Sequence, residues 1–324
     1  MNIVVTGGLG FIGHNVVRYL EGHSCSIIDN HTDYGFIPSA ELNYLISERK
    51  SRVTSLSYNI DIRNYSQLKA TVNILRPDVI IHLASFPRQK VVNTNPMAGS
   101  EVMVTGLVNL LEIAKQCKVG KFVYISSSMV YGDFQDNVRE DAVCNPQGQY
   151  GILKLTGEWL VRDYARQGHF DYTIVRPSAV YGPHDVDDRV ISKFILGAMR
   201  DQTIKVNGPE EKLDFTYVDD VARGIAQAST SSSTSGKTYN ITRGESHSLL
   251  SAANLIVDIV GTGSVMCQGR DMNFPSRGSL CIDAAQRDFN YSPQINIQEG
   301  FIRYHNWLKE SAFWQQQLLS HSLV

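Results

Sequence analysis

A glycine-rich turn near the start of the chain limits the possible folds more than any other feature. A strand-like apolar run leads directly into Gly7, Gly10 and Gly13, and a helix-like pattern follows. In such a unit the first glycine permits a tight turn, the second lets the backbone approach a pyrophosphate, and the third lets helix and strand pack closely. The N-terminus of the helix also presents free N–H groups to phosphate. The sequence therefore predicts a dinucleotide-binding fold.

Short runs of β-branched residues alternate with helix-like segments through the first half of the chain. Continuous valine and isoleucine strands separated by helices indicate a parallel sheet that is covered on both faces, which is the doubly wound α/β (Rossmann) architecture. The expected strands span residues 2–6, 25–29, 53–58, 78–84, 121–126 and 172–176.

After about Arg176 the elements become shorter and less regular. We expect an NAD-binding Rossmann domain over residues 1–176 and a smaller, mixed α/β substrate-binding lobe over residues 177–324. Segments at about 214–242 are expected to return to the first domain. Because ligands bind at the carboxyl ends of the strands in such sheets, the two parts should enclose a ligand between them.

Asp29 stands at the end of the second expected strand, in the position that selects the cofactor. A carboxylate there accepts hydrogen bonds from the adenosine ribose hydroxyls and repels a 2′-phosphate. No arginine or lysine follows it until Arg49, so the sequence predicts NAD rather than NADP. Asp61 is a candidate for the adenine amino group, although an ordinary loop acid explains it equally well.

Length and composition exclude several classes of function. The 324 residues carry a formal net charge of −2, so no overall positive field favours nucleic acid or an anionic membrane. No apolar run approaches the ~20 residues that span a bilayer, and the chain starts as a strand rather than as a signal peptide. The five cysteines have neither disulfide nor metal-ligand spacing, so we expect reduced thiols, no metal and a cytoplasmic protein.

Tyr150 and Lys154 lie one turn apart on an expected helix, so their side chains share a face. A free tyrosine has a pKa of about 10 and is a poor base at neutral pH. A nearby ammonium group stabilises the phenolate and lowers that pKa. Such a tyrosine can take a proton from a sugar hydroxyl as hydride leaves the same carbon. The pair alone is common on solvated helix faces, but here it follows a serine-rich strand end.

That strand end carries Ser126, Ser127 and Ser128. A serine at the carboxyl end of a central strand faces the ligand crevice, where its hydroxyl can bond the reacting oxygen. For Ser126 and Ser128, capping and termination of the strand is an equally good explanation.

Taken in order, these motifs resemble the extended short-chain dehydrogenase/reductases of the NAD-dependent epimerase/dehydratase family, the group that contains UDP-galactose 4-epimerase. The likeness spans nearly the whole chain. The residues that carry it are 6–13 (TGGLGFIG), Asp29, Asn30, Asp61, 82–85 (HLAS), 126–132 (SSSMVYG), Tyr150, Lys154, 176–183 (RPSAVYGP) and 214–221 (DFTYVDDV).

The resemblance implies nucleotide sugars as substrates and assigns roles to residues. Ser127 would be the catalytic serine, Tyr150 the base and Lys154 its partner. The residues expected to bind the cofactor are Gly7, Gly10, Phe11, Ile12, Gly13, Asp29, Asn30, Asp61, Ile62, Leu83, Ala84, Ser85, Ser126, Tyr150, Lys154 and Pro177. Those expected to bind the substrate are Arg88, Ser127, Ser128, Lys212 and Arg277. Arg277 is the candidate for the diphosphate because guanidinium bridges phosphate oxygens; an ordinary surface arginine is the alternative.

Three departures from the family pattern concern the sugar nucleotide. Leu213, beside Lys212, replaces an arginine that often precedes the Asp-Phe/Tyr pair, while Ala179 and Met103 replace asparagines. The resemblance therefore leaves the sugar and its mode of binding open. Arg88 is a candidate to supply a replacement charge.

The resemblance also ranks the possible reactions. Related 4,6-dehydratases carry an acidic pair just after the catalytic serine or threonine, and decarboxylating relatives carry a glutamate, whereas Ser128 and Met129 stand there in this chain. Neither can serve as a carboxylate acid or base. We therefore expect a nucleotide-sugar epimerase that acts at C4 through a transient keto sugar. The alternative is an NADH- or NADPH-dependent 4-keto-sugar reductase, ahead of a dehydratase or a non-catalytic dinucleotide-binding protein.

Relatives usually pair through the helices that correspond to residues 97–117 and 150–167 of this chain. The resemblance therefore implies a homodimer. The apolar residues of those helices would fit a sheet-facing core equally well.

Overall fold

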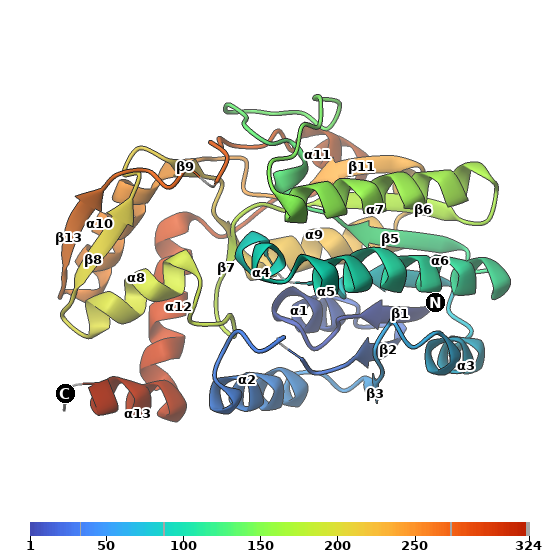
Figure 1. The fold of residues 1–324 in the computed structure, drawn as a ribbon, viewed down its shortest axis with the longest axis horizontal. Helices are drawn as coiled ribbons and strands as arrows, with labels where there is room; N and C mark the ends of the chain where they lie inside the picture. The colour runs from blue at the N-terminus through green and yellow to red at the C-terminus, as the bar shows by residue number, and fades with distance from the viewer. Residues whose placement is uncertain (33, 87, 273, 322–324) are drawn as a thin grey trace.

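The computed structural model describes residues 1–32, 34–86, 88–272 and 274–321. Its centre is a seven-stranded parallel sheet in the order β11-β6-β5-β4-β1-β2-β3 (Figure 1). The strands are β1 (Asn2–Thr6), β2 (Ser24–Asp29), β3 (Leu56–Asn59), β4 (Val79–His82), β5 (Lys121–Ile125), β6 (Asp171–Arg176) and β11 (Lys237–Asn240). The doubly wound α/β fold expected from the sequence is confirmed.

The strand order reverses beside β1, which pairs with β2 on one side and with β4 on the other. At such a point the chain leaves the two neighbouring strands in opposite directions, and a crevice opens at their carboxyl ends. The glycine-rich turn follows β1 directly, so it lies in this crevice.

Both faces of the sheet are covered by helices, and neighbouring strand residues alternate between two separate cores. One face packs on α1 (Phe11–Tyr19), α9 (Val218–Thr230) and α11 (Asp283–Phe289). The other packs on α3 (Tyr65–Leu75), α6 (Gly106–Gln116) and α7 (Gln149–Arg166). This double burial explains why the strands read as continuous apolar runs, since each buried Val, Leu or Ile contributes about 1.5–3 kcal/mol.

Two elements from the second half of the chain lie on the first domain. Helix α9 packs against α1, and β11 pairs with β6 in parallel, with Asn240 opposite Arg176. The sheet therefore contains residues from both halves of the sequence.

The remaining second half forms a smaller lobe beside the carboxyl ends of the strands (Figure 1). Its core is a third apolar cluster, separate from the two that cover the sheet. The elements of the lobe are β7 (Val180–Tyr181), α8 (Val190–Met199), β8 (Thr203–Asn207), β9 (Lys212–Leu213), β10 (Thr216–Tyr217), β12 (His247–Ser248), α10 (Leu249–Val260), β13 (Ser264–Gln268), α12 (Ile297–Glu310) and α13 (Ala312–His321).

One helical segment is more apolar than the sequence analysis allowed. Pro96–Gln116 joins α5 (Pro96–Ser100), a π-helical turn (Glu101–Thr105) and α6 into 21 residues, with a mean hydropathy of 1.3 in its most apolar window. By length and composition alone this segment is sufficient to cross a membrane. Half of that window is buried inside the protein, as in the core helix of a globular domain.

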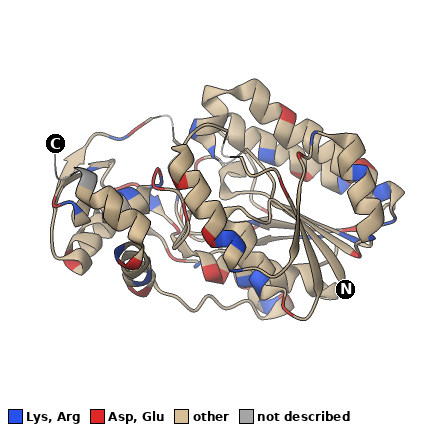
Figure 2. Cartoon of the chain, turned by 90° about the horizontal axis from the view of Figure 1, so that it is seen from below, with Lys and Arg blue, Asp and Glu red and all other residues tan. Residues whose placement is uncertain are grey.

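Positively and negatively charged residues are mixed along the ribbon (Figure 2). This mixing agrees with the formal net charge of −2. The overall charge balance therefore predicts little long-range attraction for polyanions, and any concentration of charge has to be sought locally.

Candidate active site

A cleft of about 750 Å³ lies at the carboxyl ends of the strands, between the sheet and the smaller lobe. The sheet contributes the residues that follow β1, β2, β4, β5 and β6, namely Gly7, Asn30, Leu83, Ser126 and Pro177. The lobe contributes Arg189, Lys205, Phe274 and Arg277, among others. All of the residues proposed from the sequence line this cleft except Asp61 and Lys212.

The glycine-rich loop has the geometry that a bound pyrophosphate requires. Gly7 has a positive φ of 72°, and a Cβ there would lie 2.6 Å from the backbone nitrogen of Ala84. A Cβ on Gly13 would lie 2.1 Å from the carbonyl oxygen of Gly7. Gly10 is the N-cap of α1 and makes no side-chain cap bond, so the positive end of the helix dipole faces the cleft. The loop therefore fits the diphosphate of a dinucleotide.

The Asp29 carboxylate is fixed at the end of β2 by two backbone donors. Leu9 N donates to one of its oxygens at 2.9 Å and His31 N donates to the other at 2.8 Å. A carboxylate oxygen has more than one lone pair, so both oxygens still accept from ribose hydroxyls. The site consequently fits NAD.

Asp61 lies outside the lining of the cleft, although Ile60 and Ile62 are part of it. Its carboxylate accepts from the Arg63 guanidinium at 2.7 Å and from Asn30 Nδ2 at 3.1 Å. The Arg63 side chain holds the pKa of Asp61 below its usual value. Asp61 therefore contacts the lining of the cleft through Asn30.

Tyr150, Lys154 and Ser127 meet in the cleft, as their spacing predicted. Both Tyr150 and Ser127 line the cleft, and the Ser127 side chain acts on the Tyr150 hydroxyl so as to lower its pKa. Ser127 Oγ also accepts from Met129 N at 3.2 Å, which fixes the serine at the end of β5. Lys154 shares the α7 face with Tyr150, and its Nζ lies 5.9 Å from the centre of the tyrosine ring.

The charges around Tyr150 differ in detail from the sequence expectation. Burial raises the pKa of Tyr150, while the charge of Arg189 and the Ser127 side chain act in the opposite direction. Lys154 Nζ donates to the Ile125 carbonyl at 2.8 Å, and burial lowers the pKa of Lys154 to about 7. In the free cleft, the nearby charge that favours the phenolate thus comes from Arg189, which the sequence analysis did not single out.

The two serines beside Ser127 have structural partners. Ser126 Oγ donates to the buried carboxylate of Glu158 at 2.6 Å, and Ser128 Oγ donates to Ser178 Oγ at 3.1 Å. Both residues still line the cleft. These two hydrogen bonds therefore hold the end of β5 against α7 and against the residues that follow β6.

The three cations proposed to contact the substrate lie in different environments. Arg277 lines the cleft, its Nε has no hydrogen-bond partner among the described residues, and burial lowers its pKa to about 10. Arg88 also lines the cleft, but it donates to the Asp188 carboxylate at 2.7 Å. Lys212 is outside the cleft and pairs with Asp136 at 3.1 Å. Only Arg277 combines a place in the cleft with an unused donor.

Comparison with known proteins decides the family. The model of the NAD dependent epimerase/dehydratase family matches residues 3–242 of this chain. The chain belongs to that family. UDP-glucuronate 4-epimerase of Thermodesulfobacterium geofontis is 31% identical over 318 residues, which cover 95% of this chain and 96% of the relative. An uncharacterized UDP-glucose epimerase of Bacillus subtilis, YtcB, is 29% identical over 93% of this chain and 95% of its own length.

Solved structures of family members share the whole fold. UDP-glucuronic acid 4-epimerase from Bacillus cereus, in complex with UDP-glucuronic acid and NAD, is 28% identical with a TM-score of 0.87, covering 96% of this chain and 99% of the other. The dTDP-glucose 4,6-dehydratase DesIV from Streptomyces venezuelae, with NAD and TYD bound, is 25% identical with a TM-score of 0.86, covering 98% and 100%. The chain is thus an NAD-dependent enzyme of this family, and an isomerase reaction is the best supported.

Sequence reasoning missed Arg49, which joins the two parts of the family fold. This buried residue of α2 (Ser39–Ser51) donates to the Leu9 carbonyl at 3.3 Å and to the His184 carbonyl at 2.6 Å. Leu9 belongs to the glycine-rich loop and His184 to the loop that enters the smaller lobe. From the sequence, Arg49 is only the first arginine or lysine after Asp29, too distant in the chain to indicate NADP.

A buried carboxyl cluster lies beside Arg49. Glu41 of α2 is 3% exposed, and its Oε1 accepts from Asp187 N at 2.9 Å. Burial, together with the neighbouring carboxylates of Asp187 and Asp185, raises the pKa of Glu41 to about 7. When Glu41 is protonated, its carboxyl group can donate a hydrogen bond to the Asp187 carboxylate. The contact between α2 and the lobe loop therefore depends on pH.

We expect Glu41 to stabilise the folded protein less as the pH rises from about 4.5 to about 7, so the unchanged protein should lose stability relative to Glu41→Gln over that range. The unfolded state ionises Glu41 near its ordinary pKa, whereas the folded state keeps the proton up to about pH 7. The contribution is thus intact at pH 4.5 and below and is fully lost above pH 7. Urea unfolding at pH 5.5, 6.5 and 7.5 measures the free energies of unfolding. Equal pH slopes for the two proteins would contradict the assignment.

Proposed function

We propose that the protein is an NAD-dependent 4-epimerase of a nucleotide sugar. The observation that carries the proposal is that Ser127, Tyr150 and Lys154 line one cleft, next to a glycine-rich loop that fits NAD. NAD held by the glycine-rich loop would supply the acceptor for hydride from the reacting sugar carbon and the donor for its return to the opposite face. The relatives named as UDP-sugar 4-epimerases support the same reaction.

The chain's own residues handle the proton. Ser127 would bond the reacting sugar hydroxyl, and the phenolate form of Tyr150 would take the proton as hydride leaves. Lys154, one turn along α7, has its Nζ 5.9 Å from the centre of the Tyr150 ring, and the charge of Arg189 favours the phenolate. After the keto sugar turns over in the cleft, Tyr150 returns the proton to the new hydroxyl, so the protein ends the cycle unchanged.

The positions after Ser127 favour epimerisation over elimination. Ser128 is bonded to Ser178, and the Met129 sulfur lies 3.6 Å from an Arg277 nitrogen. Neither supplies the acid and base that are needed to remove water across a C–C bond. Positions 128 and 129 therefore give the keto sugar no acid–base pair for elimination, which favours its reduction.

The diphosphate of the substrate fits at Arg277. This guanidinium lines the cleft near Met129, two residues from the catalytic serine, and no carboxylate among the described residues forms an ion pair with it. An unpaired, half-buried guanidinium is stabilised by an anion with several oxygens. Held there, the diphosphate places the attached sugar beside Ser127 and Tyr150.

The purified protein should release about one NAD per chain when it is denatured. An epimerase uses the cofactor twice in each turnover and needs no exchange, so tight retention has no kinetic penalty. Chromatography of the supernatant identifies and quantifies the dinucleotide. An empty protein that oxidises NADH with a 4-keto sugar would contradict the proposal and favour the reductase alternative.

Replacing Tyr150 with Phe should lower the epimerisation rate by about 10²- to 10⁴-fold, because the variant lacks the proton acceptor. The phenyl ring keeps its packing, so the unfolding midpoint should change little. Rates are measured by chromatographic separation of the sugar-nucleotide epimers. Tyr172→Phe, on β6 and outside the cleft lining, is the matched control. Full activity of the Tyr150 variant would exclude the assigned base.

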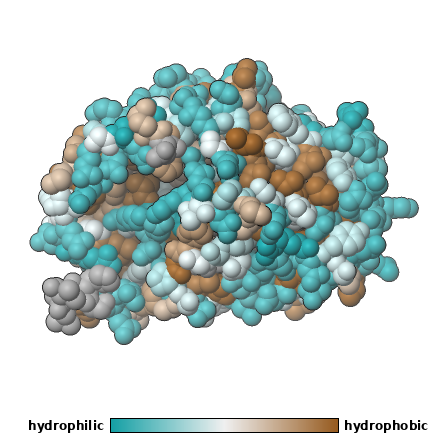
Figure 3. All heavy atoms as spheres, in the orientation of Figure 1, coloured by the Kyte–Doolittle hydropathy of each residue, from teal (hydrophilic) through white to brown (hydrophobic). Residues whose placement is uncertain are grey.

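We also infer that the protein is cytoplasmic and pairs with a second copy through α5, α6 and α7. All five cysteines are free, which agrees with a reducing compartment. Figure 3 shows apolar surface over the region of these helices. Met97, Ile152 and Trp159 are 77%, 49% and 62% exposed.

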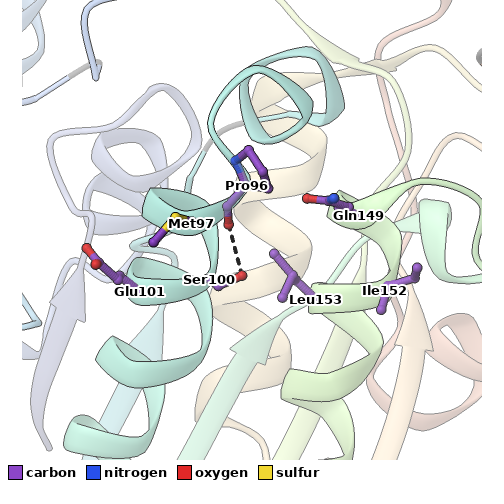
Figure 4. Close-up of a pocket in the computed structure, with 7 residues that line it drawn as sticks. All are labelled: Pro96, Met97, Ser100, Glu101, Gln149, Ile152 and Leu153. Atoms are coloured by element: carbon purple, nitrogen blue, oxygen red, sulfur yellow. Dashed lines mark hydrogen bonds between the residues drawn. The ribbon is translucent and has the colours of Figure 1, made fainter.

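A hollow of about 430 Å³ lies between α5 and α7 on this face, with Met97 on one side and Ile152 on the other (Figure 4). Exposed apolar patches that are broken by such hollows are typical of protein interfaces. A covered face would also explain why Pro96–Gln116 combines a membrane-like hydropathy with partial burial.

Sedimentation at micromolar concentration should give a dimer, and Trp159→Glu should shift it toward a monomer, because the new charge would be buried in the interface. Glu310, which is exposed at the end of α12, offers a control when it is changed to Gln. A clean monomer for the unchanged protein would refute the inferred dimer.

A further inference from the structure

The guanidinium of Arg277 reaches the cleft with little support from its own side-chain contacts. One of its nitrogens lies 3.6 Å from the Met129 sulfur, and its Nε has no hydrogen-bond partner among the described residues. Arg88, by contrast, is held by the Asp188 carboxylate at 2.7 Å. A long side chain without an anchoring carboxylate depends on its backbone for its position. The residues that hold the backbone around Arg277 therefore decide where its charge lies.

The segment of residues 276–281, which carries this arginine, pairs with residues 133–138, the loop that follows the catalytic strand β5. Phe134 N donates to the Ser276 carbonyl at 2.9 Å, and backbone hydrogen bonds of 2.8 and 3.1 Å join Val138 to the far end of the segment. The position of the arginine is thus tied to the end of β5 and not to the smaller lobe alone.

Asp136 joins this loop to three segments of the second half of the chain. Its Oδ1 accepts from Ser279 N at 2.9 Å and from Ser246 Oγ at 2.5 Å, and its Oδ2 accepts from Lys212 Nζ at 3.1 Å. The bonds from Ser246 and from Ser279 N lower the pKa of Asp136 to about 2, so the carboxylate stays ionised near neutral pH. Lys212, which the sequence suggested as a substrate contact, therefore binds the loop that holds the arginine segment.

Asp133 connects the same segment to the catalytic helix. Its Oδ1 accepts from Ser276 N at 2.7 Å, and its Oδ2 accepts from Gln147 Nε2 at 2.5 Å. Ser276 directly precedes Arg277, and Gln147 lies just before the first turn of α7, which carries Tyr150. One carboxylate thus joins the backbone of the arginine to the start of the helix that holds the base.

Gly278 allows the close approach on which these bonds depend. A Cβ at this position would lie 2.5 Å from the backbone nitrogen of Asp136 and 2.4 Å from the carbonyl carbon of Gln135. Both are backbone atoms, so they can move aside only if the loop moves with them. A side chain at position 278 would therefore push the arginine segment away from Asp136.

We propose that Asp133 and Asp136 are positioning residues for the diphosphate of the substrate, because they fix the segment that carries Arg277. This inference rests on the proposed function and on its diphosphate site. Neither carboxylate belongs to the lining of the cleft, so both act through the arginine. A guanidinium that is already in place loses less freedom when a nucleoside diphosphate binds. The bond from Gln147 also holds this site in a fixed position relative to Tyr150.

The first test is a double-mutant cycle between Asp136 and Arg277. Calorimetry measures the dissociation constant of UDP, with NAD in excess, so the test needs no turnover. We expect Asp136→Ala to weaken UDP binding by about tenfold, on the scale of a hydrogen bond to a charged group, and Arg277→Leu to weaken it at least as much. In the Arg277→Leu background, Asp136→Ala should have little further effect, because it acts through that arginine.

Two further variants separate positioning from general support of the fold. Asp133→Ala removes the bond to Ser276 N instead, and its effect on UDP binding should likewise disappear in the Arg277→Leu background. Asp136→Asn keeps an acceptor oxygen for Ser279 N and should recover part of the affinity. In epimerisation assays, Asp136→Ala should raise KM by a larger factor than it lowers kcat, since the catalytic residues keep their own contacts.

Asp288→Ala is the matched control. Asp288 also accepts hydrogen bonds from three side chains, and these bonds also lower its pKa to about 2. It lies on α11 and outside the lining of the cleft, so its loss should leave UDP binding unchanged. A loss of affinity in Asp288→Ala as large as that in Asp136→Ala would show a general effect on the fold and would overturn the inference.

The cycle distinguishes this inference from the proposed reaction. Additive effects of Asp136→Ala and Arg277→Leu would overturn the positioning role and leave the epimerase function intact. UDP binding that is absent, or that Arg277→Leu does not weaken, would overturn the role together with the diphosphate site. Coupled effects on UDP binding without turnover of any sugar nucleotide would support the positioning role and refute the proposed function.

Discussion

The buried ion pair between Glu158 and Arg176 connects most of the elements that build the site. Arg176, at the end of β6, donates to Glu158 of α7 from two nitrogens, at 2.9 and 2.7 Å. Ser126 of β5 donates to the same carboxylate, and Arg176 also donates to the Tyr131 hydroxyl at 2.9 Å. Burial alone would raise the pKa of Glu158, and the bonded arginine keeps it below its usual value instead. Breaking such a pair typically costs about 3–5 kcal/mol, because one charge is then left buried without a partner.

The ion pair also determines where the chemistry occurs. Glu158 is one turn beyond Lys154 and two turns beyond Tyr150, so fixing it fixes the face of α7 that enters the cleft. Ser127 directly follows Ser126 at the end of β5. The hydrogen-bonded network around Glu158 therefore fixes the part of α7 that carries Tyr150 and Lys154 and the end of β5 that carries Ser127. Residues of the smaller lobe, and with them the substrate that is bound, can therefore differ while this network stays the same.

A second connection, through Arg49, runs between the cofactor loop and the lobe. Its guanidinium bonds one carbonyl on each side, and carbonyls do not neutralise its charge. The nearby acids Asp185 and Asp29 supply part of that balance. Asp185 of the lobe loop thus has two partners, since it stabilises Arg49 on one side and forms an ion pair with Arg189 on the other.

How far the sequence predicts the molecule depends on whether a feature is local. The strands and the glycine-rich loop are local, and the positions of all six expected strands agree with the sheet to within a few residues. The spacing of Tyr150 and Lys154 is a helical property and holds equally well. Lys212 was misjudged because a residue on the two-stranded β9/β12 ribbon can point to either side, and here it reaches Asp136 instead of the cleft.

The features that sequence reasoning missed arise from irregular segments that only the tertiary fold brings together. Asp185, Asp188 and Arg189 follow Gly182 in a loop without periodicity, so no spacing rule indicates which of them faces Tyr150. The one available signal was the concentration of charge between Gly182 and the start of α8. In such a loop, partners that are distant in sequence set the direction of each group. Arg49 binds the His184 carbonyl, and Arg88 binds the Asp188 carboxylate.

The residues after the catalytic serine show how the same frame excludes a competing reaction. In this chain Ser128 binds Ser178 beneath the cleft, and Met129 contacts the guanidinium of Arg277. A carboxylate at position 129 would pair with Arg277 and neutralise a cleft arginine whose Nε has no hydrogen-bond partner among the described residues and which is suited to a diphosphate. Methionine, with a polarizable sulfur and no charge, contacts the guanidinium without competing for it. The choice of a neutral residue at this position thus serves binding of the diphosphate and loss of the elimination chemistry at the same time.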